Sequence, residues 1–193
     1  VESRGLGDVY KRQMLDKLCC SPEFLIATGR SINKERMKDQ YVVLRAIAFL
    51  MLHRGEFKDI PALQYRGDID DFLARFMVYV NDNAPEKLIV DYENLFIRCM
   101  QISYDLLGEN GFRFSGNGIR RPINMPLFEA LSYLFSFVPE KIDYTWASRL
   151  ILDIESVKEE FDDSRYFSGN IDSTTSVSFR FDRMDKIINR IQL

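Results

Sequence analysis

The sequence has very little histidine and cysteine, and it has no long apolar segment. Its 193 residues include one histidine and three cysteines. A mechanism of the Ser-His-Asp or Cys-His type would have to use His53, and three thiols are too few for a disulfide framework or a zinc site. The longest strictly apolar run, residues 46–52, is far shorter than the roughly 18 residues of a membrane span. We therefore expect a cytoplasmic protein with reduced thiols, no metal site and no membrane contact.

Neither sign of charge dominates the chain. Its formal net charge is −3, and 28% of its residues are charged. This balance argues against a nucleic-acid-binding surface that covers the whole domain, although a local basic face remains compatible with it. Fifteen phenylalanines and nine tyrosines supply ample core for a chain of single-domain length.

The first residues differ from the rest of the chain. Residues 1–13 read VESRGLGDVYKRQ and show the periodicity of neither a helix nor a strand. The stretch DVYKRQ resembles the translation of a transposon-end adapter that is used to tag DNA for sequencing. We therefore expect residues 1–13 to be adapter-derived or, if genuine, disordered. Residues 14–193 then form a single helical domain, the C-terminal part of a larger protein.

From residue 14 onward, the apolar residues recur at helical spacing. Pro22 and Gly29 mark the two ends of a short helix, and Gly55 and Gly108 end two long helices. The expected helices cover residues 14–19, 22–29, 33 or 34 to about 54, 69–82, about 86–107, 126–138, 145–163 and 174–191. This pattern predicts a mainly α protein, a compact bundle of about six longer helices around one core, with little or no β structure.

One segment breaks the helical pattern. Residues 108–126 read GENGFRFSGNGIRRPINMP, with four glycines and two prolines. The sequence allows at most one short β-hairpin in this segment, within residues 112–123. The segment is not a P-loop, because it lacks the motif GxxxxGK[ST]. Its adjacent Arg120 and Arg121 are candidate phosphate contacts, with a solvated loop as the alternative.

Two arginines lie on faces that should be buried. Arg45 is the one exception among the twelve otherwise apolar residues 41–52, and Arg180 falls within the apolar face of the last helix. An unpaired buried charge costs several kcal/mol, so each arginine needs a carboxylate or carbonyl partner. Asp39 lies about 240° around the helix from Arg45 and so cannot be that partner. Either the arginines form internal salt bridges that fix the helix register, or they face a site completed by residues outside this chain.

The last helix also carries three basic residues on one flank. Arg183, Lys186 and Arg190 fall within about 60° of one another on a helical wheel. Such a flank would suit the phosphate backbone of nucleic acid, and a solvated surface is the alternative.

Two further groups have a structural explanation that competes with a functional one. Asp68, Asp70 and Asp71 form an acidic cluster, but they begin a predicted helix, where carboxylates cap the chain and offset the helix dipole. His53 ends a predicted helix beside Arg54, where a C-cap role is natural. We therefore expect neither a cation site nor a catalytic residue there.

The stretch from Arg36 to Leu52 reads RMKDQYVVLRAIAFLML. Its order of arginine, Asp-Gln and Leu-Arg resembles the helical region of the GmrSD-type restriction-endonuclease N-terminal domain family. YRGDIDDFLARFMVYVN and INMPLFEALSYLF are similar to later parts of that family, and the resemblance extends over about residues 14–193. On the matched positions, Arg36, Asp39 and Arg45 are candidate motif residues.

In this family, a ParB/sulfiredoxin-like nucleotide-binding domain with an Asp-Gly-Gln-Gln-Arg motif precedes the helical region. No such motif occurs in this chain. The resemblance therefore implies the supporting helical region of a bacterial anti-phage, modification-dependent restriction nuclease, without catalytic residues or a cofactor of its own. For the full-length protein it implies DNA and the missing N-terminal domain as partners, with nucleotide and divalent metal as cofactors. The alternative is a self-contained helical protein-interaction module without enzymatic activity.

Overall fold

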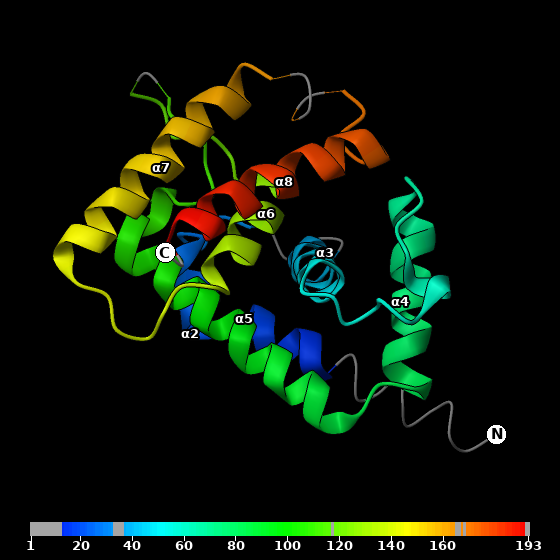
Figure 1. The fold of residues 1–193 in the computed structure, drawn as a ribbon. Coiled ribbons are helices and arrows are strands. Elements are labelled where there is room, and N and C mark those ends of the chain that lie inside the picture. The colour runs from blue at the N-terminus through cyan, green and yellow to red at the C-terminus, as the bar shows by residue number, and fades with distance from the viewer. Residues whose placement is uncertain (1–12, 33–36, 117, 165–166, 168, 192–193) are drawn as a thin grey trace.

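The computed structural model describes residues 13–32, 37–116, 118–164, 167 and 169–191, and these residues form a compact all-α bundle (Figure 1). No strand occurs among them, which confirms the mainly α prediction. None of the described helices is long and apolar enough to cross a membrane.

The helices follow the predicted order closely. Residues 13–19 are helical, and residues 1–12 of the adapter-like stretch lie outside the described part. The α-helices that follow are α2 (Pro22–Ala27), α3 (Lys38–His53), α4 (Ile69–Asp82), α5 (Glu86–Leu107), α6 (Met125–Phe135), α7 (Tyr144–Asp162) and α8 (Thr174–Ile191). Short 3₁₀ turns, η2 (Pro61–Leu63) and η3 (Gly108–Asn110), precede α4 and follow α5.

Side-chain caps explain where several helices begin. The Asp68 carboxylate accepts a hydrogen bond from the Asp71 backbone N–H at 3.0 Å, as the sequence predicts. Asn124 and Asp143 cap α6 and α7 in the same way, each accepting from the backbone N–H three residues later. Each cap satisfies a backbone donor that the first helical turn leaves without a partner.

The start of α3 differs from the prediction. The sequence pattern places the helix start at Asn33 or Lys34, whereas α3 begins at Lys38. The cause is Met37, whose φ of 56° puts it in the left-handed region, so an α-helix cannot pass through it. Residues 33–36 themselves lie outside the described part.

Helix α6 forms the centre of the bundle. Each residue from Pro126 to Phe135 is buried, and α3, α5 and α8 pack against this helix (Figure 1). A helix that is apolar around most of its circumference requires neighbours on all sides. Glu129 is the one acidic or basic residue of α6, and it is therefore forced into the interior.

Aromatic rings join the outer helices to this centre. The ring of Phe49 on α3 lies 5.4 Å from that of Phe72 on α4 and 5.6 Å from that of Phe181 on α8. The ring of Phe24 on α2 lies 6.2 Å from that of Phe96 on α5 and 6.2 Å from that of Phe128 on α6. These contacts place a continuous apolar core between helices that are far apart in the sequence.

The short hairpin that the sequence allows within residues 112–123 does not occur among the described residues of this range. Phe112, Arg113 and Phe114 are consecutive and all buried, whereas a strand at the surface would bury alternate residues. A backbone bond from the Asn124 N–H to the Phe112 carbonyl at 3.0 Å closes the segment into a loop. The described part of this loop is thus anchored by its side chains and not by a strand ladder.

Candidate functional site

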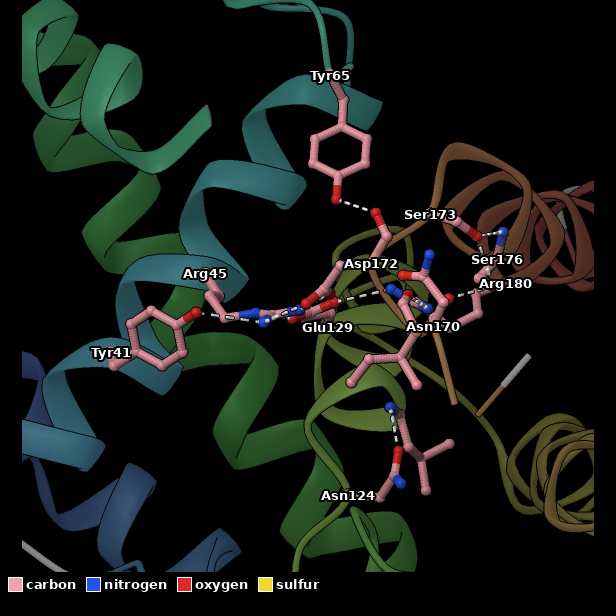
Figure 2. Close-up of polar contacts among 12 residues, drawn as sticks. Tyr41, Arg45, Tyr65, Asn124, Glu129, Asn170, Asp172, Ser173, Ser176 and Arg180 are labelled. Carbon is pink, nitrogen blue, oxygen red and sulfur yellow. Dashed lines mark hydrogen bonds and ion pairs between the residues drawn. The ribbon is translucent and has the colours of Figure 1, made fainter. Parts of the chain in front are cut away.

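Two arginines share one carboxylate in the middle of the bundle. Arg45 Nε donates to Glu129 Oε1 at 2.5 Å, and Arg180 Nη2 donates to Glu129 Oε2 at 3.2 Å. The side chains of Glu129 and Arg180 are fully buried, and that of Arg45 is 3% exposed. Figure 2 shows the three side chains converging from α3, α6 and α8.

Asp172, in the loop before α8, extends this group toward the surface. Its carboxylate accepts from Arg45 Nη2 at 2.6 Å, and its backbone carbonyl accepts from the Tyr65 hydroxyl (Figure 2). The neighbouring Ile171 carbonyl accepts from Arg180 Nη1 at 2.5 Å. We call Arg45, Glu129, Asp172 and Arg180 the charge cluster.

The electrostatics of the charge cluster are those of mutually paired buried ions. Burial alone lowers the pKa of Arg45, but the carboxylates of Glu129 and Asp172 outweigh it and raise that pKa. Burial raises the pKa of Glu129, and attraction to both arginines opposes this rise. The sequence left two explanations for the buried arginines. The described contacts agree with the first, internal salt bridges, and these bridges join three helices.

The other candidate motif residues do not join this cluster. Asp39 is buried, and its carboxylate accepts from the Gln40 backbone N–H at 2.9 Å. Arg45 bonds to Glu129, Asp172 and Tyr41 instead, in agreement with the helical-wheel argument against an Asp39 pair. Arg36 lies outside the described residues.

His53 serves the core and not the helix end. Its ring stacks on Phe181 of α8, with centroids 3.5 Å apart and planes inclined by 8°. Burial, together with the nearby Arg180 charge, lowers the pKa of His53 to about 3. The imidazole is therefore neutral near pH 7, and the C-cap position that the sequence suggested for His53 is occupied by Arg54.

A polar pocket lies between the loop after α5 and one side of α7. Its volume is about 550 Å³, and it is lined by described residues of 109–121 and by Glu155 and Lys158. Both predicted phosphate contacts of this segment, Arg120 and Arg121, line it. We call this cavity the loop pocket.

A second depression, of about 500 Å³, lies between α7 and α8. Arg183, Lys186 and Arg190, the predicted basic flank of α8, all line it. Arg190 pairs with Asp153 at 3.3 Å, and Arg183 pairs with Glu160. We call it the interhelical depression. The five basic candidates thus fall into two groups, and α7 contributes side chains to both.

Two cations of the loop pocket were not singled out in the sequence. Arg113 and Lys158 line the pocket and are only 4% and 5% exposed. Arg113 lies between two buried phenylalanines, and this unusual position for a charge is the signal that could have identified it. Lys158 sits in the charged run KEE of α7, where nothing distinguishes it from a solvated lysine.

Comparison with known proteins does not assign this chain. No family model, no curated protein and no solved structure matches it. The family resemblance of the three quoted stretches therefore supports a proposal of function and does not establish one.

Replacing Glu129 by glutamine tests the charge cluster. The amide keeps the shape of the side chain but leaves the two buried guanidinium groups without its negative charge, so we expect a loss of about 3–5 kcal/mol in the free energy of unfolding. Urea denaturation measures it. Glu159→Gln, at an exposed position of α7, is the control and should change stability by less than about 0.5 kcal/mol. Equal effects of the two substitutions would contradict the role of the cluster.

His53 predicts a specific dependence of stability on pH. Its pKa is near 3 in the folded chain and about 6.5 when unfolded, so the unfolded state binds the extra proton between these values. Stability should therefore fall as pH drops below about 6.5, by about 2 kcal/mol at pH 5. His53→Phe keeps a ring beside Phe181 and should remove this loss in urea titrations at pH 7.5 and 5. An unchanged loss in the variant would rule out His53 as its source.

Proposed function

We propose that this chain is the helical supporting region of a GmrSD-type restriction nuclease, and that it contacts the DNA backbone through the interhelical depression. The resemblance of the three sequence stretches supports the first part. The grouping of Arg183, Lys186 and Arg190 in one depression supports the second part and is the observation on which the proposal depends.

The chemistry of the interhelical depression suits a phosphate backbone. Three cations and one carboxylate, Asp153, line it. Lys186 is exposed, and the side chain of Arg190 is 58% exposed, so a ligand in solution can reach both. Glu160 and Asp153 hold the two arginines in position but offset part of their charge. Binding should therefore be weak, sequence-independent and sensitive to salt.

The charge cluster supports the architectural part of the proposal. It joins α3, α6 and the segment leading into α8, and α8 carries the basic flank. A rigid attachment of α8 to the core gives its cations fixed positions. The nuclease centre itself is expected in the upstream domain that the resemblance implies.

The alternative is a self-contained helical interaction module. An apolar groove of about 350 Å³ between η2 and α4 favours it, lined mainly by Ile60, Leu63, Ala74, Val78 and Tyr79. Val78 is 56% exposed, which is high for an apolar residue on a helix. Such a groove would accept an apolar side chain of a protein partner. A fluorescent dye that binds exposed apolar surface would occupy this groove, and its displacement by a protein partner would report on binding there.

Anisotropy titration of a labelled DNA duplex tests the DNA contact. We expect wild-type affinity to fall with salt with a slope of up to about −2.7, which corresponds to three phosphate contacts at about −0.9 each. Arg183→Ala/Lys186→Ala should weaken binding and reduce the slope by about 1.8, because two contacts are lost.

Lys87→Ala/Lys141→Ala is the matched control, because it removes two exposed positive charges outside the depression. It should leave the slope unchanged. If both double variants lose affinity equally, binding reflects net charge alone and the proposed contact fails. If the wild type does not bind the duplex in low salt, the interaction-module alternative gains support.

A further inference from the structure

The loop pocket differs from the rest of the surface in the burial of its cations. Arg113 and Lys158 lie almost entirely below the surface, yet both line a cavity that opens to solvent. Long cationic side chains normally extend into water, and burying one requires partners for its charge. The partners of these two residues therefore indicate what the pocket is built to hold.

Arg113 is held by neutral groups. Its guanidinium donates to the carbonyls of Thr28, Glu109 and Arg121 and to the Ser31 hydroxyl. Among the described residues, no carboxylate forms an ion pair with it. Burial lowers its pKa, and repulsion from Arg120 lowers it further, against an opposing effect of Glu109. The charge of Arg113 is thus fixed in place but not neutralised by a contact.

The other cations leave the pocket with an excess of positive charge. Lys158 Nζ donates to Glu155 Oε1 at 3.1 Å and to the Asn110 carbonyl at 3.3 Å. Arg120 pairs with Glu109 at 2.9 Å. Four cations and two carboxylates therefore line the cavity, and Asp162 offsets Arg121 from outside the lining. The local excess is between one and two positive charges.

Two glycines of the loop, Gly116 and Gly118, line part of the pocket. A Cβ atom at Gly116 would lie 2.2 Å from the Ile119 carbonyl oxygen, so a larger residue would displace the backbone there. Gly118 has a φ of 79°, a conformation that side chains disfavour. Arg121 lies over the Phe114 ring, 5.3 Å from its centroid, which restrains the guanidinium at the rim.

We propose that the loop pocket is a binding site for a phosphate monoester group, held by Lys158, Arg120 and Arg121 near the buried charge of Arg113. A phosphate monoester carries about 1.5–2 negative charges near neutral pH, which matches the local excess. Arginine side chains pair with phosphate oxygens through two parallel hydrogen bonds. The cavity of about 550 Å³ exceeds a phosphate group and leaves room for an attached nucleoside or small organic group. This site is separate from the DNA contact proposed for α8.

Two probes distinguish a free phosphorylated compound from the end of a nucleic acid. Adenosine 5′-monophosphate is titrated against the purified chain by calorimetry, with adenosine as the control. A 3′-labelled single-stranded oligonucleotide is compared by anisotropy with and without its 5′-phosphate. We expect at least one phosphorylated probe to bind about tenfold more tightly than its unphosphorylated form, and the pair that shows this preference identifies the source.

Lys158→Met and Arg120→Gln should each abolish most of this preference, about tenfold, whereas Lys87→Met at an exposed site should retain it. Arg120 is half-exposed, so its variant tests the site even if Lys158→Met fails to fold. Arg183→Ala/Lys186→Ala should also retain the preference, which separates this site from the DNA contact. Equal affinity of both probe pairs in the wild type, or an undiminished preference in both pocket variants, would overturn the proposal.

Discussion

Glu129 forms salt bridges with two arginines that lie 135 residues apart in the chain, and the arrangement of the helices depends on this shared carboxylate. It lies on α6, where the surrounding residues are all buried, and it accepts from Arg45 of α3 and Arg180 of α8. Apolar packing alone would allow three such helices to slide along one another, because apolar contacts have little directional preference. Hydrogen bonds between buried ions are directional, and any shift would leave a charge unpaired at a cost of several kcal/mol.

The same constraint places the two basic cavities. Arg180 holds α8 against the core through Glu129 and the Ile171 carbonyl, and α8 in turn packs on α7. Helix α7 then lines the interhelical depression with Asp153 and the loop pocket with Lys158. The charge cluster therefore fixes the architecture, whereas the charges that line the two cavities lie on either side of α7. The proposed DNA contact and the proposed phosphate site use this second set.

Much of the fold follows from local patterns in the sequence. Apolar spacing, prolines and glycines predict α5 and α8 with the bounds that the structure shows, because these signals act within one or two turns of a helix. The burial of Arg45 and Arg180 is predicted for the same reason. Their partners are not, because Glu129 and Asp172 come from elements whose adjacency is set by packing. The left-handed Met37 and the loop conformation at residues 112–116 were likewise missed, since apolar spacing carries no signal for either. Lys158 of the loop pocket has no local signal at all.

A double-mutant cycle between Arg45 and Arg180 tests the central claim most directly. Both arginines bond to Glu129, and the charge of Arg45 also acts directly on Arg180, so an energetic coupling between them reports on the ionic network that the shared carboxylate joins. Urea denaturation of Arg45→Met, Arg180→Met and the double variant gives the coupling free energy. The shared carboxylate predicts a coupling of at least about 1 kcal/mol, as expected for residues of one ionic network. Losses that add to within about 0.3 kcal/mol would contradict it and would show that each arginine stabilises its own helix independently.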